Sequence, residues 1–259
     1  MTKRFRFVRL STRNRVAWLE FDRPPVNAFN REMVTETRSA IEAALSDPES
    51  KVMVLGSANA QYFSAGADLR VFSGMKSDGM RRWVSECHDI ARLLRNSAKP
   101  LLAAINGTAV GGGLEMTLHC DVRFAAVDAK LGQPEINIGF IPPIATTQAL
   151  ARLLGRPRAI RYLYEGGLVP ARDALTMGLV DELIPSDRLF EHVQRYAEYL
   201  ASKPASALAA IRQTVTLGGG KSFDEGMAIE LEATTALADT ADFAEGVAAF
   251  LQKRAPNWS

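Results

Sequence analysis

The sequence predicts an α/β fold in which a core of alternating strands and helices is followed by a helical C-terminal region. Two observations support this prediction. As far as about residue 187, short apolar runs bounded by Gly, Pro or Asp alternate with stretches of helical periodicity. From residue 188 onward the pattern is helical throughout. Such alternation is typical of a sheet with helices packed against it, and we divide the chain into a core over residues 1–200 and a helical region over residues 201–259.

Two predicted strands flank the first predicted helix. The strands cover residues 15–21 and 51–55, and both are dominated by apolar residues. Asn30 is a suitable N-cap for the helix between them, which we expect to end near residue 45. The second strand leads into a loop over residues 56–68 that contains Ala65-Gly66-Ala67-Asp68.

The middle of the chain holds a glycine-rich junction. A helix with Trp83 on its apolar face precedes a buried strand over residues 101–105. Three consecutive glycines, residues 111–113, then lead into a helical stretch with Glu115 near its start. Glycines allow a ligand to approach the backbone, and the N–H groups at the start of a helix can bind negative charge. The simpler alternative is a tight turn with a solvated acid, which suits the helix dipole.

The remaining elements follow in order. We expect strands over 122–127 and 179–184, helices over 146–154 and 171–177, and four C-terminal helices over 188–201, 205–217, 222–238 and 242–253. An irregular apolar stretch with two prolines, residues 137–143, precedes the helix at 146. Glycines 218–220 separate two C-terminal helices, and we interpret them as a hinge or cap because no strand precedes them.

The bulk composition limits the classes of protein. Of the 259 residues, 47% are apolar and 23% are charged, as in a domain with a sizeable core. The net charge is +2 with scattered basic residues, so we expect no nucleic-acid partner, and no apolar run is long enough to predict a membrane partner. A basic start without an apolar signal segment favours a cytoplasmic location. Cys87 and Cys120 have neither disulfide nor metal spacing, and we expect buried thiols.

Several catalytic motifs are absent. Neither the spaced glycines of a dinucleotide-binding fold nor the Lys-Ser/Thr of a phosphate loop is present, which argues against a nucleotide-dependent enzyme. His88, His119 and His192 are isolated, so the sequence predicts no metal site and no histidine-based triad. Ser64 lies outside a nucleophile-elbow pattern. The arginines at 152, 156, 158 and 161 predict a solvated face, with a phosphate-bearing ligand or a partner subunit as the alternative.

Three segments remain as a candidate site: residues 65–68, 111–115 and 133–135. The first two each follow a predicted parallel strand, and sites gather in loops at the carboxyl ends of such strands. N–H groups from two loops form a minimal oxyanion hole, in which removing one donor typically costs about a hundredfold or more in rate. Two glutamates near such a hole, Glu115 and Glu135, can divide acid and base duties if their environments separate their pKa values.

These segments resemble the crotonase family, also called the enoyl-CoA hydratase/isomerase family, over essentially the whole chain. The shared features occur in the family's order along the sequence. They are Arg23-Pro24, Asn27-Ala28, Ala65-Gly66-Ala67-Asp68, Asn106-Gly107 with glycines 111–113, Cys120-Asp121, Gly132-Gln133-Pro134-Glu135, Ala174, Gly178-Leu179-Val180, Glu245-Gly246 and Ala249-Phe250. Each piece is weak alone, whereas the ordered set is highly specific.

The resemblance implies a fold, an assembly and a substrate. The implied fold is a spiral of repeated strand-strand-helix (ββα) units with a helical C-terminal region that supports trimerisation. The expected partners are therefore copies of the same chain, in a homotrimer or in a homohexamer built as a dimer of trimers. The implied substrate is an acyl-CoA thioester of lipid metabolism. No cofactor is expected, because coenzyme A is part of the substrate.

The resemblance also implies which backbone groups bind the substrate. The N–H groups of Ala65 and Gly112 are expected to form the oxyanion hole that holds the thioester oxygen as it becomes an enolate. Gly66, Ala67 and Asp68 are expected to line the CoA-binding loop with them. This role suits backbone dipoles that are already aimed at the developing charge.

The acidic positions indicate the reaction. Members of the family that add water across a 2,3-double bond carry two glutamates, which here match Glu115 and Glu135, twenty residues apart. Members that shift a double bond often lack the first one. The resemblance therefore implies that Glu115 orients and deprotonates water for attack at C3, and that Glu135 delivers a proton to C2.

Two departures from the family pattern concern the substrate. Pro142, Pro143 and Ile144 stand where many hydratases have a glycine-rich stretch after a proline. Pro143 lacks an N–H, so we expect either slower hydration or a pocket that these residues reshape for a ring or branched acyl group. Pro25 replaces a lysine that is common after Arg-Pro, which leaves the anchor of the CoA phosphates open.

The predicted function is therefore that of an enoyl-CoA hydratase, a hydro-lyase. One alternative is another enzyme on the same scaffold, either a double-bond isomerase or a CoA-thioester or ring-opening hydrolase. Both glutamates favour hydration, and Pro143 keeps this alternative open. The other alternative is a non-catalytic RNA-binding role, which the near-neutral net charge does not favour.

Overall fold

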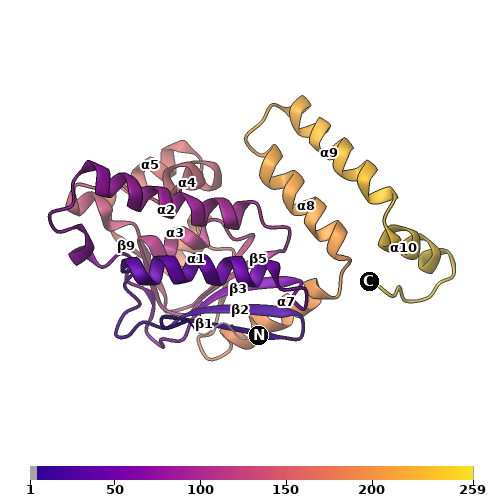
Figure 1. Cartoon of the computed structure of the whole chain (residues 1–259), viewed down its shortest axis with the longest axis horizontal. Helices are drawn as coiled ribbons and strands as arrows, with labels where there is room; N and C mark the ends of the chain where they lie inside the picture. The colour runs from indigo at the N-terminus through magenta and orange to yellow at the C-terminus, as the bar shows by residue number, and fades with distance from the viewer. Residues whose placement is uncertain (1–4, 259) are drawn as a thin grey trace.

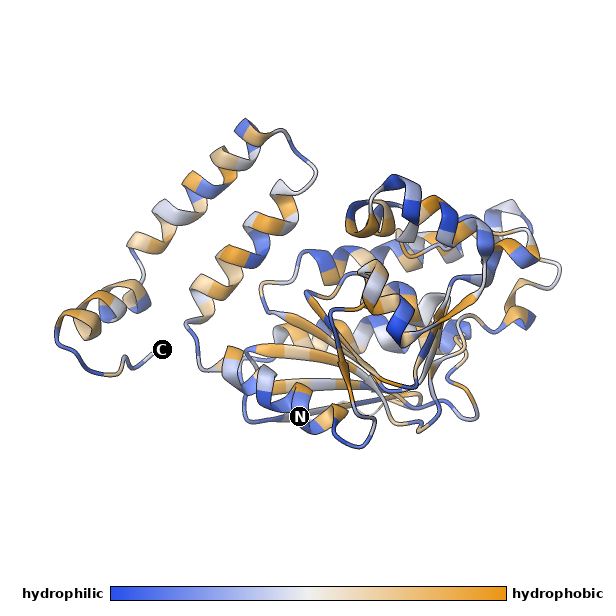
Figure 2. Ribbon diagram, turned by 180° about the vertical axis from the view of Figure 1, so that it is seen from behind, coloured by the Kyte–Doolittle hydropathy of each residue, from blue (hydrophilic) through white to orange (hydrophobic). Residues whose placement is uncertain are grey.

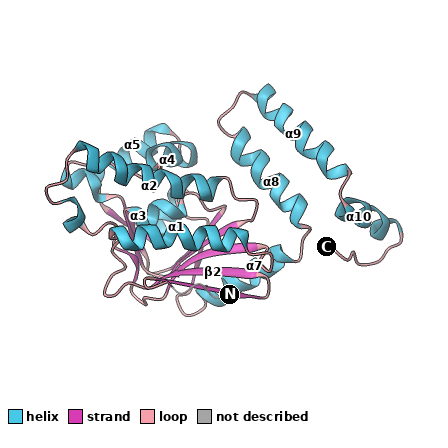
Figure 3. Ribbon diagram, viewed as in Figure 1, coloured by secondary structure: helices cyan, strands magenta, loops and turns pink. Residues whose placement is uncertain are grey.

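The computed structural model describes residues 5–258 and has two sheets at its core (Figures 1 and 3). The larger sheet has the strand order β1-β2-β3-β5-β7-β10, and the smaller one has the order β4-β6-β8-β9. The strands are β1 Val8–Arg13, β2 Val16–Phe21, β3 Val52–Ser57, β4 Tyr62–Ser64, β5 Leu101–Ile105, β6 Thr108–Val110, β7 Val122–Ala126, β8 Lys130–Gly132, β9 Leu168–Pro170 and β10 Glu182–Ile184. Neighbouring strands are parallel except for the pairs β1–β2 and β8–β9.

Successive strands from β3 to β8 belong alternately to the large and the small sheet. β3, β5 and β7 lie side by side in the large sheet, and the short strand that follows each of them joins the small sheet. Each strand pair leads into helical structure, so the chain winds as the predicted spiral of ββα units. Gly107 makes one of these tight turns possible, because a Cβ there would lie 2.3 Å from the carbonyl oxygen of Gln61. β3 and β5 are buried at every position, as expected for parallel strands covered on both faces.

Helices α1 Arg31–Ser46 and α7 Leu189–Ala201 pack on the large sheet (Figure 1). The other helices of the core are α2 Ser77–Arg95, α3 Gly112–Thr117, α4 Thr146–Leu154, α5 Arg156–Glu165 and α6 Ala171–Met177, with 3-10 turns η1 Leu69–Phe72 and η2 Pro134–Ile138. Side chains of β2 alternate between the faces. Phe21 packs edge-to-face on Phe29, which precedes α1, whereas Trp18 contacts Phe190 and Gln194 of α7.

Three C-terminal helices, α8 Ala205–Gly218, α9 Phe223–Ala238 and α10 Ala241–Leu251, project away from the sheets (Figure 1). Buried Arg212 fixes the first of them to the core by donating to Asp121 and to the carbonyls of Leu94 and Ser97. Figure 2 shows many apolar positions along these helices, although they stand apart from the sheets. Several apolar side chains there are exposed: Ile211, Val215, Phe223, Leu231, Phe250 and Leu251.

The larger elements agree with the sequence predictions, as do the short elements α6 and β10, whereas several other short elements were missed. The Asn30 side chain accepts the N–H of Met33 as the predicted N-cap of α1. The sequence missed β1, the three-residue strands of the small sheet, and α5, whose arginines were interpreted as a solvated face with a phosphate-bearing ligand or a partner subunit as the alternative. Those arginines are exposed, as predicted. Cys87 and Cys120 are buried free thiols. No helix among residues 5–258 is long and apolar enough to span a membrane.

Candidate active site

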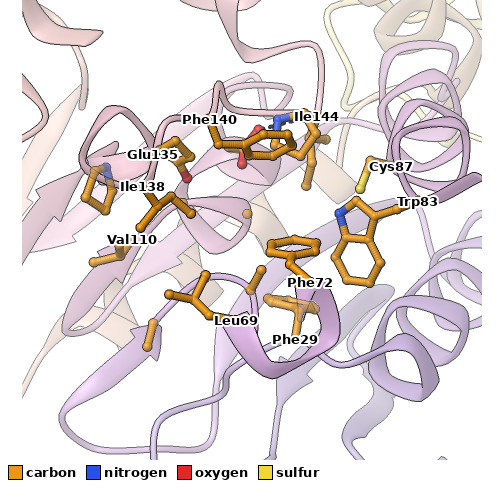
Figure 4. Close-up of a pocket in the computed structure, with 18 of the residues that line it drawn as sticks. Phe29, Leu69, Phe72, Trp83, Cys87, Val110, Glu135, Ile138, Phe140 and Ile144 are labelled. Atoms are coloured by element: carbon orange, nitrogen blue, oxygen red, sulfur yellow. Dashed lines mark hydrogen bonds between the residues drawn. The ribbon is translucent and has the colours of Figure 1, made fainter. Parts of the chain in front are cut away.

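A cavity of about 300 Å³ lies where the loop after β4, the start of α3, η2 and the inner face of α2 meet (Figure 4). Two of its walls come from consecutive turns of the spiral, so segments far apart in sequence become neighbours. Its lining residues are Phe29, Val34, Ala65, Gly66, Ala67, Leu69, Phe72, Trp83, Cys87, Ile90, Val110, Gly111, Gly112, Glu115, Met116, Pro134, Glu135, Asn137, Ile138, Phe140, Pro143 and Ile144. The structure therefore brings the three predicted segments together around one space.

Glycine is required where the first two of these segments touch. Gly66 and Gly111 have φ angles of +82° and +51°, which side chains rarely adopt. A Cβ at Gly66 would also lie 3.0 Å from the carbonyl oxygen of Val110. One residue beyond Gly112, a Cβ at Gly113 would lie 2.4 Å from Cβ of Ser64. These close approaches and φ angles explain glycine at positions 66, 111 and 113.

The two glutamates flank the same glycine pair. A Cβ added at Gly111 would lie 2.6 Å from Oε1 of Glu135, and one added at Gly112 would lie 4.0 Å from Oε1 of Glu115. Oε1 of Glu115 and Oε2 of Glu135 are buried and have no hydrogen-bond partner among the described residues. Both carboxyl groups therefore keep acceptor capacity beside the glycines, where a ligand can use it.

Glu115 is fixed on its other oxygen. It lies in the first turn of α3 and is fully buried. Its Oε2 accepts the N–H of Ile144 at 2.7 Å and the hydroxyl of Thr146 at 2.6 Å. Ala145, between the two donors, has a φ of 53°, and this left-handed residue turns the chain so that both donors reach one oxygen. The sequence did not identify Thr146, which appeared only as the start of a predicted helix.

His119 holds the segment that supplies these two donors to Glu115. Its Nε2 lies 2.8 Å from the carbonyl oxygen of Ile144. A carbonyl only accepts, so Nε2 carries the proton. Burial lowers the pKa of His119 to about 4, which keeps the ring neutral. The histidine that the sequence analysis treated as isolated thus holds Ile144, the residue whose N–H binds Glu115.

Pro143 does not remove the N–H that orients Glu115. That N–H belongs to the next residue, Ile144. Pro143 and Ile144 line the main cavity, as the pocket-shaping prediction expected, whereas Pro142 lines an adjoining cavity of about 580 Å³.

Glu135 lies on η2, which is held from two sides. Its carbonyl accepts the N–H of Phe140 at 3.0 Å. On the other side, Nδ2 of Asn137 donates to the carbonyl of Gly166 at 3.1 Å, which ties η2 to the end of α5. The carboxyl group itself has no such anchor on Oε2.

Both carboxyl groups have raised pKa values. Burial, followed by the charge of Glu135, raises the pKa of Glu115 to about 8, against the opposing hydrogen bonds of Thr146 and Ile144. Burial raises the pKa of Glu135 to about 7. Near neutral pH the pair therefore holds about one proton between its two members, the charge state that a combined acid and base require.

The structure corrects one predicted oxyanion donor. The N–H of Ala65 donates to the carbonyl of Val26 at 2.9 Å, so it is not available to a ligand, and the prediction for this donor is wrong. Two residues on, Ala67 lines the same cavity, and its N–H has no acceptor among the described residues. Gly112 is the first residue of α3, where an N–H has no partner within the helix. The sequence could not separate these alanines, because both flank Gly66.

Asp68 holds the loop in place from outside the cavity lining. Its carboxylate accepts hydrogen bonds from Arg70 at 2.7 Å and from Arg23 at 3.4 Å. The hydrogen bond from Arg70 holds the pKa of Asp68 at about 2. The ion pair between Asp68 and Arg23 joins the loop after β4 to the turn after β2.

The part of the cavity near α2 is aromatic (Figure 4). Phe72 packs edge-to-face on Trp83 with ring centroids 5.2 Å apart, and it contacts Phe140 at 5.8 Å. The sequence placed Trp83 on an apolar helix face but did not assign it to a site. Among the described residues, no group of three or more His, Cys, Asp and Glu side chains is placed to hold a metal ion.

Comparisons with known proteins agree with this geometry. A family model described as enoyl-CoA hydratase/isomerase matches residues 11–259. A crotonyl-CoA hydratase of Syntrophomonas wolfei is 32% identical over 250 residues, which cover 96% of each chain. The 2,3-dehydroadipyl-CoA hydratase of Escherichia coli is 35% identical over 251 residues, which cover 96% of this chain and 97% of that one. A crystal structure of an enoyl-CoA hydratase from Geobacillus kaustophilus is similar at a TM-score of 0.95 and 30% identity, covering 100% of this chain and 98% of that one.

Proposed function

The chain belongs to the enoyl-CoA hydratase/isomerase family, and from this premise we propose that it adds water across the 2,3-double bond of a 2-enoyl-CoA thioester. One observation carries the proposal. Two carboxyl groups, each with one oxygen that has no hydrogen-bond partner in residues 5–258, flank the glycine pair at 111–112. A hydration needs both an acid and a base, whereas a double-bond shift can use one group for both proton transfers.

The proposed roles follow from the donors and acceptors around the cavity. The N–H groups of Ala67 and Gly112 hold the thioester oxygen and stabilise the enolate charge that develops on it. Oε1 of Glu115 accepts a proton from the water that attacks C3. Glu135 delivers a proton to C2, and both glutamates hold the water. The net change is the addition of one water, with the thioester bond intact.

The loop around Gly66 is the proposed place of the CoA chain near the thioester. Gly66 and Ala67 line the cavity, and the ion pairs of Asp68 with Arg23 and Arg70 keep this loop in position. The proposal requires no cofactor, because coenzyme A belongs to the substrate. A cytoplasmic location stays a prediction.

Incubation with crotonyl-CoA tests the proposed reaction. Loss of the conjugated enoyl absorbance together with a product heavier by one water supports hydration. An unchanged mass with a moved double bond would establish isomerisation instead, and release of free CoA would establish a hydrolase. Butyryl-CoA is the matched control, because it has the same length and lacks the double bond. It should give no product.

We also propose that residues 201–259 serve self-association, as a homotrimer or a homohexamer. Support comes from the exposed apolar side chains of α8–α10, such as Phe223 and Phe250, which are each 83% exposed. Burying apolar surface of this kind is a main driving force of association. Light scattering on the purified chain should give three or six times the chain mass. A monomer at micromolar concentration would contradict the assembly and leave the hydration proposal unaffected.

A further inference from the structure

One polar group at the aromatic end of the cavity has no role in the proposed reaction. Trp83 is 3% exposed, and its indole Nε1–H is buried without a hydrogen-bond partner among the described residues. In Figure 4 the indole nitrogen is on the side of the ring that faces Cys87 and the interior of the cavity. Buried tryptophan N–H groups usually have a partner. This one is placed where a bound acyl group can supply the acceptor.

Among the described residues that line the cavity, no side chain accepts a hydrogen bond from Trp83. Phe72 packs against the ring, and Cys87 and Ile90 follow on the same face of α2. Burial, followed by the charge of Glu115, raises the pKa of the Cys87 thiol, so it stays neutral. The remaining polar lining groups belong to the glutamates, to Asn137 and to the backbone. The indole N–H is thus a single donor in an apolar wall.

We propose that this site prefers enoyl-CoA substrates whose acyl group carries a neutral hydrogen-bond acceptor, such as an ether, ketone or hydroxyl oxygen, placed to meet Nε1 of Trp83. The inference rests on the proposed function, since it takes the acyl group to extend from the glycine pair toward α2. A substrate with only methylene groups leaves the N–H unpaired, and sites built to hydrogen-bond a ligand discriminate against analogues that lack the partner.

A negatively charged acyl end does not fit this position. No Lys, Arg or His is among the described residues that line the cavity. The charge of Glu115 reaches Cys87, one helical turn from Trp83, so the local field disfavours an anion. A buried carboxylate with one neutral donor would retain most of its desolvation cost. Three basic residues, His88, Arg92 and Arg95, line the adjoining cavity instead.

A matched series of substrates tests the inference. The reference is 2-octenoyl-CoA, and the ether series replaces one methylene by oxygen: 4-propoxy-2-butenoyl-, 5-ethoxy-2-pentenoyl- and 6-methoxy-2-hexenoyl-CoA. All have eight chain atoms, so length and shape are constant. At least one ether should exceed the reference in kcat/KM by about three- to tenfold, the range of one neutral hydrogen bond. A decrease for every ether would overturn the inference. So would a preference for the terminal carboxylate of 2-octenedioyl-CoA.

Two variants assign the effect to the indole N–H. Trp83→Phe keeps an aromatic ring and removes the donor, so the preferred ether should fall below 2-octenoyl-CoA in this variant. Phe72→Leu is the control, because it disturbs the packing of the same wall without touching the donor, and the ether preference should remain. An equal loss on ether and reference in Trp83→Phe would contradict the inference. If Trp83→Phe does not fold, the wild-type series decides alone.

Binding measurements separate this inference from the proposed reaction. Titration calorimetry with octanoyl-CoA and 6-methoxyhexanoyl-CoA, and with the other two saturated ethers, needs no turnover. An ether preference in binding without any hydration would support the acceptor-binding site and reject the hydratase proposal. Hydration without an ether preference would support the hydratase proposal and reject the acceptor-binding site.

Discussion

The two carboxyl groups of the site differ in how they are held. Glu115 projects from the first turn of a helix, is fully buried, and has one oxygen fixed by two donors. Glu135 lies on a 3-10 turn, is partly exposed, and is fixed through its backbone and through Asn137. The first carboxyl group is oriented by donors from another segment, whereas the second is held by a hydrogen bond from its own backbone. A water needs a base at a fixed angle, whereas a proton donor to C2 can adjust to the bound substrate.

The raised pKa values add a requirement to the proposed roles. Burial raises the pKa of both Glu115 and Glu135, so in the free protein either carboxyl group can hold the shared proton. Activation of the water requires this proton to be on Glu135, so that Glu115 is ionised and can act as the base. The Ile144 N–H and the Thr146 hydroxyl reduce the cost of ionising Glu115, because they donate to the charged form. Substrate binding then has to favour transfer of the proton to Glu135.

The largest expected effect comes from removing either carboxyl group. Glu115→Gln and Glu135→Gln should each lower kcat for crotonyl-CoA hydration by about 10²–10⁴-fold, the usual contribution of a positioned acid or base. Glutamine preserves size, so binding of butyryl-CoA should stay close to wild type. Steady-state kinetics and calorimetry provide the two readouts. Near-normal turnover in either variant would reject the paired-glutamate mechanism.

The next largest effect is expected from removing the backbone N–H of Gly112, which lies between the two glutamates. Gly112→Pro removes the N–H at the first position of α3, where proline is compatible with a helix. We expect kcat to fall by about 10²–10³-fold, as for loss of one oxyanion donor. Gly112→Ala is the matched control, because it keeps the N–H and its Cβ would meet Cδ1 of Ile144 at an ordinary 3.6 Å. Equal activity of the two variants would exclude Gly112 as a donor.

The smallest effect tests the fixed orientation of Glu115. Thr146→Val removes the hydroxyl donor while keeping the side-chain shape, so the pKa of Glu115 rises further. Because the base has to be ionised, the acid limb of the pH–rate profile should move to higher pH, and kcat near neutral pH should fall about tenfold. Thr147→Val is the control, since the Thr147 hydroxyl accepts a long hydrogen bond of 3.4 Å from Gln148 and has no hydrogen bond to Glu115 within the described part of the chain. A profile unchanged in Thr146→Val would show that this hydrogen bond does not affect the base.

The sequence predicted the architecture and the three converging segments, because buried strands and glycine turns leave strong local patterns. It could not choose between Ala65 and Ala67, since the choice depends on which N–H donates to the carbonyl of Val26, in the distant segment after β2. It also missed Thr146 and Trp83. Their importance comes from a left-handed residue at 145 and from the packing of α2 against η1, neither of which is visible in periodicity.

The pH dependence of kcat/KM for crotonyl-CoA hydration tests most directly the claim that the glutamates act as a pair sharing one proton. At low pH both carboxyl groups are protonated and no base remains, and at high pH both are ionised and no acid remains. The raised pKa values predict a bell-shaped profile with its maximum between about 7 and 8. A profile whose only limb lies near the ordinary carboxyl value of 4.5, with no loss of rate at alkaline pH, would contradict the account.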